Sequence, residues 1–99
     1  TGDASGIEVI LKELNNPESG ELVTAIKAAA KLTESQQALE PLRKLVKHNQ
    51  DAVAANAILA LGELSDKDST PMLKQILRDQ KQSKAKRAAS LMALNLLAK

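Results

Sequence analysis

The feature that most constrains this chain is a helical pattern that recurs about every 32 residues. The segment 56–64 (NAILALGEL) overlays segment 24–32 (TAIKAAAKL), with Ala, Ile and Leu at matching places, and it also overlays segment 89–97. Within each segment the apolar residues follow the i, i+3, i+4, i+7 spacing of one helix face. The pattern predicts stacked helical hairpins, of which three are the usual minimum for a stable array.

Turn and cap signals divide the chain into six expected helices. We expect residues 1–6 to be a flexible lead-in and 7–99 to form a single domain, with repeats at about 7–34, 35–66 and 67–99. The helices are predicted at about 7–14, 19–32, 37–48, 51–64, 70–79 and 84–99. Ile7 begins the first apolar face, and the Asn-Asn-Pro sequence at 15–17 ends that helix. Asp51 is the expected cap of the fourth helix, and Ser69 or Thr70 that of the fifth.

Composition narrows the fold and excludes several chemistries. The chain has 16 Ala and 16 Leu, one His, and no Phe, Trp, Tyr or Cys. Alanine contributes little buried area but lets backbones approach, which favours closely stacked helices over a sheet. Without cysteine there are no disulfides, thiolate metal sites or cysteine nucleophiles. His48 is expected to interact with the carbonyls at the end of its helix. We therefore predict a protein that is not an enzyme and has no cofactor or metal.

The middle of the chain resembles a known repeat. Residues 51–66, followed by 70–79, resemble a HEAT-like repeat of the short type found in phycobilisome-lyase-like proteins. The matching residues are Asp51, Val53, Ala57, Ala60, Leu61, Gly62 and Leu64. Ala54 departs from the family, which usually has Arg there, whereas the third copy has Arg87. The first copy is degenerate, with Ala29 and Ala30 where Leu61 and Gly62 would stand.

This resemblance implies an all-α fold, a right-handed α-solenoid of three HEAT-like hairpins. It also implies a non-catalytic scaffold or adaptor that binds another protein along a concave face lined by the second helix of each hairpin. The chain lacks the His-Glu pairs of HEAT-like hydroxylases and the aromatic residues of HEAT-like DNA glycosylases. A non-catalytic subunit of a lyase-type enzyme is a further alternative.

Helical periodicity selects candidate partner-binding residues on the second helices. The side of helix 52–64 that faces away from its own hairpin is apolar, and the matching side of the last helix is similar. Such a ridge is either a shallow groove for an apolar partner segment or a surface packed against neighbouring hairpins. The candidates are Ile26, Ile58, Leu59, Leu91 and Met92.

Charge is unevenly distributed along the chain. Residues 1–66 carry 6 basic and 10 acidic side chains, net −4, whereas residues 67–99 carry 8 basic and 2 acidic, net +6. The basic patch consists of Lys74, Arg78, Lys81, Lys84, Lys86 and Arg87. It is either a solvated face or a site for an acidic partner, nucleic-acid phosphates or an anionic membrane. Self-association of acidic and basic ends is a third interpretation.

The last helix is rich in leucine, and Leu94, Leu96 and Leu97 leave it no fully polar outer face. These side chains either fold inward or are covered by a partner or by the rest of a longer chain. No apolar run reaches the length of a membrane span. The absence of cysteine and of a signal peptide favours a cytoplasmic location.

Overall fold

The computed structural model describes the backbone of residues 2–31 and 36–98, and the side chains of residues 8–31 and 36–98. All regular structure in these residues is helical, which confirms the predicted all-α fold. The α-helices are α1 (Gly2–Leu14), α2 (Leu22–Lys31), α3 (Leu39–Leu45), α4 (Asp51–Glu63), α5 (Thr70–Arg78) and α6 (Lys84–Leu97). Two short 3₁₀ turns, η1 (Gln36–Ala38) and η2 (Lys67–Ser69), precede α3 and α5.

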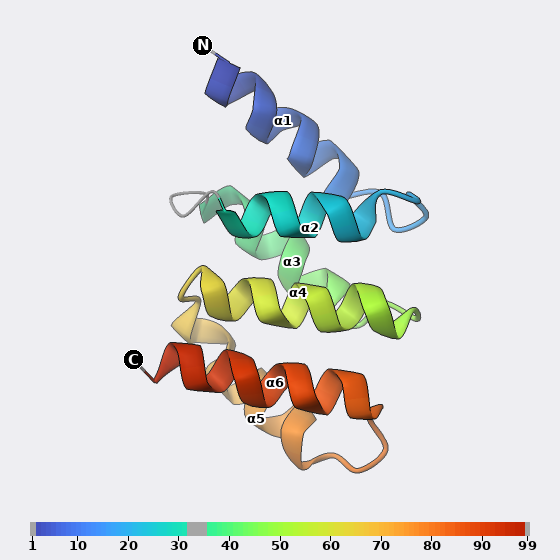
Figure 1. Ribbon diagram of the computed structural model, residues 1–99, viewed down its shortest axis with the longest axis vertical. Helices are drawn as coiled ribbons and strands as arrows, with labels where there is room; N and C mark the ends of the chain where they lie inside the picture. Colours follow the sequence, from blue (N-terminus) through green and yellow to red (C-terminus); the bar gives the residue numbers. More distant parts are fainter. Residues whose placement is uncertain (1, 32–35, 99) are drawn as a thin grey trace.

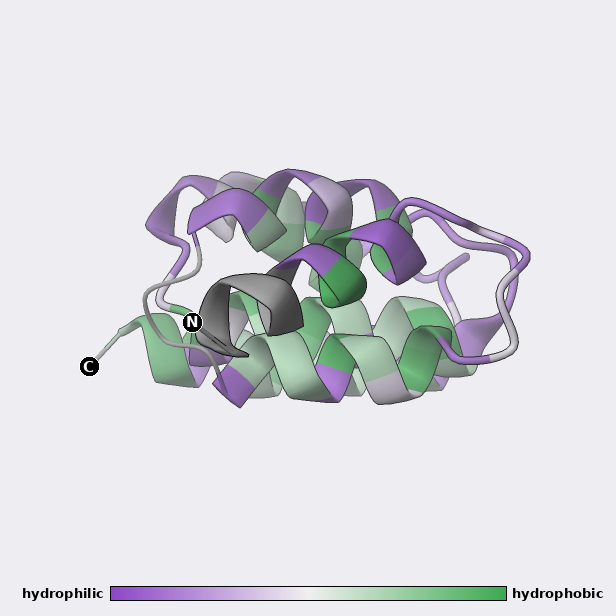
Figure 2. Ribbon diagram, turned by 90° about the horizontal axis from the view of Figure 1, so that it is seen from above, coloured by the Kyte–Doolittle hydropathy of each residue, from purple (hydrophilic) through white to green (hydrophobic). Residues whose placement is uncertain are grey.

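The helices form two layers that extend along one axis. The second helices α2, α4 and α6 lie side by side in one layer, with α3 and α5 behind them and α1 tilted across one end (Figure 1). The Cα atoms span 44 × 31 × 15 Å, and the shortest dimension accommodates only two layers of helices. The second-helix layer is coloured mainly hydrophobic, whereas the outer side of the other layer is hydrophilic (Figure 2).

Helix boundaries differ from the sequence expectations in a few places. Helix α1 begins at Gly2 rather than near Ile7, whose side chain lies outside the described residues, as does the segment 32–35. Helix α3 ends at Leu45, short of the expected His48. Asp51 is the first residue of α4 rather than its cap, and Gln50 precedes it without a capping hydrogen bond. Asp51 still places a negative charge in the positive first turn of the helix.

Close packing of α4 against α6 depends on a glycine. A Cβ atom added at Gly62 would lie 2.7 Å from the Cα atom of Ala93, so only glycine permits the two backbones to approach this closely. The same side of α4 carries Ile58, which is fully buried. The absence of aromatic side chains from this core is therefore offset by short distances between helices.

A reversal of the chain after α4 sets the direction of the next segment. Ser65 has a φ angle of 59°, in the left-handed region that disfavours non-glycine residues. The Asp66 N–H donates to the Leu61 carbonyl oxygen at 3.0 Å, and the Ser65 N–H donates to that of Gly62 at 3.1 Å. This pair of bonds is the Schellman motif, which satisfies the last carbonyls of the helix. It brings Asp66 into the interior, where the carboxylate is almost fully buried.

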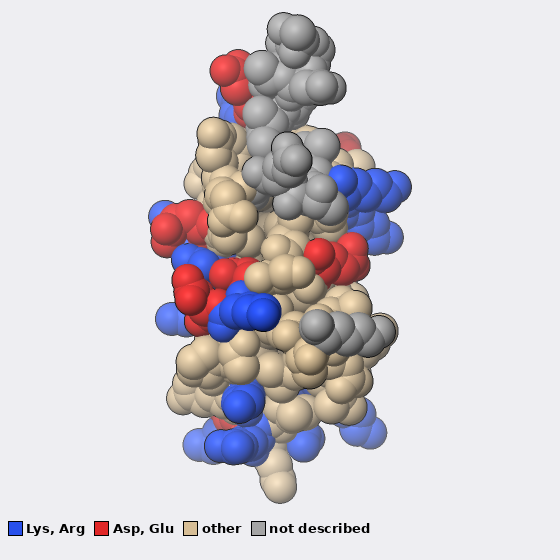
Figure 3. Space-filling model, turned by 90° about the vertical axis from the view of Figure 1, so that its left-hand side faces the viewer, with Lys and Arg blue, Asp and Glu red and all other residues tan. Residues whose placement is uncertain are grey.

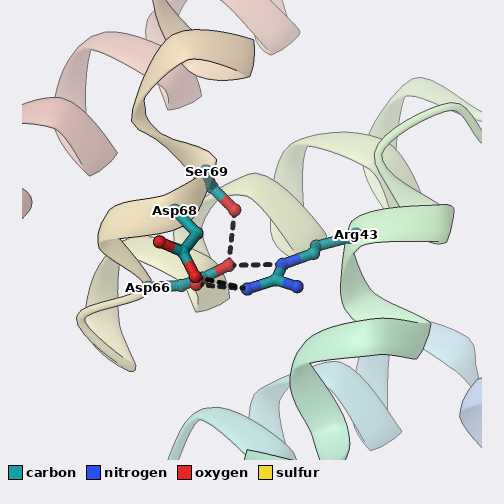
Figure 4. Close-up of polar contacts among 4 residues, drawn as sticks. All are labelled: Arg43, Asp66, Asp68 and Ser69. Atoms are coloured by element: carbon teal, nitrogen blue, oxygen red, sulfur yellow. Dashed lines mark hydrogen bonds and ion pairs between the residues drawn. The ribbon is translucent and has the colours of Figure 1, made fainter.

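The buried carboxylate of Asp66 is held by a side chain from α3 (Figure 4). Arg43 donates two hydrogen bonds to it, Nε to Oδ2 at 2.8 Å and Nη2 to Oδ1 at 2.6 Å, and the hydroxyl of Ser69 donates a third. Asp68 lies 3.9 Å from the same guanidinium. Burial raises the pKa of Asp66, but the hydrogen bonds from Arg43 and Ser69 outweigh it and hold the pKa below its ordinary value. The hydrogen bond to Asp66 also stabilises the charged guanidinium and so raises the pKa of Arg43.

We predict that Gly62→Ala destabilises the protein, although alanine favours helices by about 1 kcal/mol over glycine. The added methyl group meets the backbone of Ala93, which cannot rotate away. Overpacking of this kind costs about 1–3 kcal/mol, and we expect a lower melting temperature by circular dichroism. Gly20→Ala is the matched control, because nothing lies within 4 Å of a Cβ added there. Equal melting temperatures for Gly62→Ala and the wild type would contradict the packing account.

We predict that Asp66→Asn lowers the free energy of unfolding at neutral pH by about 1–2 kcal/mol, because hydrogen bonds to a charged group are lost. The folded-state pKa of Asp66 is lowered, so its stabilising effect is complete above the ordinary carboxyl pKa and is lost as pH falls through the folded value. The difference between wild type and variant should be constant above about pH 5 and shrink below about pH 4. Urea unfolding across this range measures it, and a difference that persists unchanged in acid would refute the assignment.

Candidate binding surfaces

The five residues predicted to bind a partner differ in exposure and fall into three groups. Ile26 and Ile58 are buried, with 1% and 0% of their surface exposed, because neighbouring second helices stack on them. The expected exposed ridge is therefore absent at these two positions, and they belong to the core between hairpins. Leu91 and Met92 on α6 are 50% and 56% exposed. Leu59 on α4 is half-buried.

A shallow groove of about 340 Å³ runs between α2 and α4. The half-buried Leu59 and the buried Ile26 contribute apolar surface to it, and exposed Lys27, Lys31 and Glu63 contribute charge. Asn56, Ala30 and Ala60 complete the lining. The groove therefore combines an apolar surface with charged groups that can orient a bound segment.

Exposed apolar side chains also lie on α6, the helix that packs beside α4. Met92 occupies the position on α6 that Leu59 occupies on α4, and the two helices lie side by side (Figure 1). Leu96 is also exposed, whereas Leu94 is half-buried and Leu97 is buried. The leucine side chains at the end of α6 are thus partly buried in the core and partly exposed. We refer to Leu59, Met92 and Leu96 as the second-helix face.

The basic patch lies at the end of the stack formed by α5 and α6. Its exposed members are Lys74, Arg78, Lys81 and Lys84, and its partly buried members are Lys86 and Arg87. Arg87 donates from Nε to the Leu77 carbonyl oxygen at 3.3 Å, so this side chain ties α6 to α5. Lys and Arg gather at the lower end of the face in Figure 3. Among the described residues, Arg43 is the basic side chain that forms ion pairs, which leaves the patch without carboxylate partners.

His48 has a structural role rather than the expected contact with its own helix carbonyls. Its Nδ1 atom accepts a hydrogen bond from the Gln50 N–H at 3.0 Å, so its Nε2 atom carries the proton and donates to the Pro17 carbonyl oxygen at 2.8 Å. The ring thereby joins the turn after α1 to the turn after α3. Both nitrogens are occupied by backbone groups, which leaves neither free as a base.

The part of the chain that the structure describes offers neither a metal site nor a membrane span. Within it, no three His, Cys, Asp or Glu residues lie close enough together to hold a metal ion. None of the described helices is both long and apolar enough to cross a membrane.

Comparison with protein families gives a match to HEAT repeats over residues 7–95. Comparison with curated proteins and with solved structures finds no match. The match is to HEAT repeats in general, and the narrower phycobilisome-lyase type stays a prediction. Because the match covers most of the sequence and reaches all the α-helices described above, this chain belongs to the family of HEAT-repeat proteins.

Proposed function

We propose that this chain is a non-catalytic protein-binding module, a scaffold or adaptor that holds a partner protein along the second-helix face. HEAT repeats generally mediate interactions between proteins. The observation that carries the proposal is the exposure of large apolar side chains on one helix, with Met92 56% and Leu96 38% exposed. Contiguous apolar surface of this kind is typical of binding sites.

The arrangement of the helices favours binding without large rearrangement. Leu59 and Met92 are presented by two helices that share the tight contact at Gly62, so their relative position is fixed before a partner arrives. A preformed surface loses little conformational entropy on binding. The apolar side chains would form the centre of the interface, and exposed charges such as Lys27 and Glu63 its rim.

The basic patch supports a second candidate function, electrostatic binding of nucleic acid or another acidic surface. Lys74, Arg78, Lys81 and Lys84 are exposed and form no ion pair with other described residues. Phosphate contacts need no aromatic side chains, so the composition does not oppose this function. Binding of this kind falls steeply as salt increases, whereas apolar docking changes little. A role as the non-catalytic subunit of a lyase-type enzyme has no support in a particular residue.

We predict that Met92→Asp abolishes retention of a specific partner in a pull-down from an extract of the source cells. Met92 is exposed, so the variant should keep the helicity of the wild type by circular dichroism. Val9→Asp is the matched control, because Val9 is 63% exposed on α1, away from α4 and α6. The specific protein should be retained by the wild type and by Val9→Asp, with little effect of moderate salt.

Two results would contradict the proposal. Retention of the same proteins by all three chains would show that the second-helix face does not bind them. Loss of all bound material after nuclease treatment would favour the nucleic-acid alternative.

A further inference from the structure

The second hairpin packs against the third through apolar residues of α4. Apolar residues recur at the equivalent positions of α6, in the third hairpin. Ala60 on α4 lines the groove against α2, and Ala93 on α6 packs against Gly62 of α4, so both alanines face the preceding hairpin. Counting from these equivalent alanines, Leu91 stands on α6 where Ile58 stands on α4. The two helices therefore carry apolar residues at equivalent positions, Ala55 and Ile58 on α4 and Ala88 and Leu91 on α6, on the side that faces onward along the stack.

The equivalent positions differ in what covers them. Ile58 lies one turn before Gly62, on the side of α4 that faces α6, and it is fully buried. Ala55 is partly buried against the same core. Their counterparts Leu91 and Ala88 are exposed, because no described element lies beyond α6. The onward-facing side of α6 thus has the apolar residues of a stacking surface and is exposed in the described part of the chain.

A basic residue also recurs at equivalent positions of α3 and α5, the first helices of the second and third hairpins. Leu42 on α3 and Leu73 on α5 are both fully buried and mark equivalent places. The residue after Leu42 is Arg43, which reaches onward to the carboxylate of Asp66. The residue after Leu73 is Lys74, which is exposed and has no ion-pair partner among the described residues. A carboxylate placed beyond α5 would meet Lys74 as Asp66 meets Arg43.

We propose that this end face docks an acidic amphipathic helix of a partner protein. The end face consists of Lys84, Ala88, Leu91 and Asn95, which follow one stripe of α6 at helical spacing, together with Lys74 of α5. Apolar side chains of the partner helix pack on Ala88 and Leu91, and its carboxylates pair with Lys74 and Lys84. The inference rests on the proposed protein-binding function and names a second surface and the chemistry of its partner.

The charges around the end face favour an acidic partner. The described part of the third hairpin carries two carboxylates, and neither neutralises the lysines of the face. The carboxylate of Asp68 lies 3.9 Å from the guanidinium of Arg43 in the second hairpin. The carboxylate of Asp79 accepts hydrogen bonds from the backbone N–H of Lys81 and the side chain of Gln82 in its own loop. The end of the stack is therefore strongly positive (Figure 3).

The residues also disfavour two other occupants. A second copy of the third hairpin would bring a basic surface against a basic surface, and among the side chains described on α1 the exposed Glu8 is accompanied by the exposed Lys12 one turn later. A further hairpin would have to pack against Asn95, whereas the two hairpin junctions in the structure have small buried residues, Ala30 and Gly62, at the equivalent positions. A single helix that lies farther out, separated by its own side chains, meets neither difficulty.

The test is a titration of the full chain with a designed peptide probe. The probe is an amphipathic helical peptide with leucines on one face, glutamates beside them and one tryptophan as a reporter. Because the chain contains no Trp, Tyr or Phe, the fluorescence reports on the peptide alone. We expect saturable binding that Leu91→Asp weakens at least about tenfold, as for a central interface residue. Ala88→Glu, at a second exposed position, should weaken binding similarly if Leu91→Asp does not fold.

Matched controls separate the end face from other surfaces. Lys74→Gln should weaken binding severalfold and reduce its salt dependence, whereas Lys12→Gln and Val9→Asp, at exposed positions on α1, should leave it unchanged. Equal binding of a scrambled peptide of the same composition, or competition by duplex DNA at the same charge concentration, would overturn the proposal in favour of a polyanion site. Absence of saturable binding would also overturn it. Binding that Met92→Asp abolishes and Leu91→Asp leaves intact would overturn the end face but keep the proposed function.

Discussion

The close approach of α4 and α6 at Gly62 is the contact on which the rest of the structure depends. A core made of alanine, leucine, isoleucine and valine has no large ring to fill space, so the helices must lie near one another to make enough contacts. Gly62 permits that approach, and the buried Ile58 one turn earlier fills the adjoining space. The position of α6, and with it the position of Met92 and Leu91, follows from this contact.

A second constraint acts at the boundary between the second and third hairpins. The left-handed conformation of Ser65 reverses the chain so that Asp66 enters the interior. There the guanidinium of Arg43 forms an ion pair with the carboxylate, and both Arg43 and Ser69 donate hydrogen bonds to it. An unpaired carboxylate at that depth would be strongly unfavourable. The pair therefore fixes where α5 begins relative to α3. The apolar contact at Gly62 and the charged contact at Asp66 hold the third hairpin from both layers.

The helix pattern, the three hairpins and the family were predictable from sequence because they depend on local spacing. The exposure of Leu91, in contrast to the burial of Ile58, was not, because the two residues occupy equivalent positions in the same apolar helical pattern. What distinguishes them is whether another hairpin follows in space. The Arg43–Asp66 pair was also missed, since it joins residues 23 positions apart and no local pattern marks either partner. Asp66 follows the predicted helix 51–64, and the positive φ angle that turns it inward falls on a serine rather than a glycine.

The proposed binding surfaces require that α6 holds its exposed apolar residues in a rigid position. Amide hydrogen exchange of the full chain tests this most directly, because exchange rates report local opening. The account predicts that the amides of α4 and α6 are protected to a similar extent and exchange together as the most stable part of the chain. It predicts this even for the turn that carries Leu91 and Met92, whose side chains are exposed. Exchange of α6 far faster than α4 would contradict the account, because the exposed leucines would then belong to a loosely held helix rather than to a preformed docking surface.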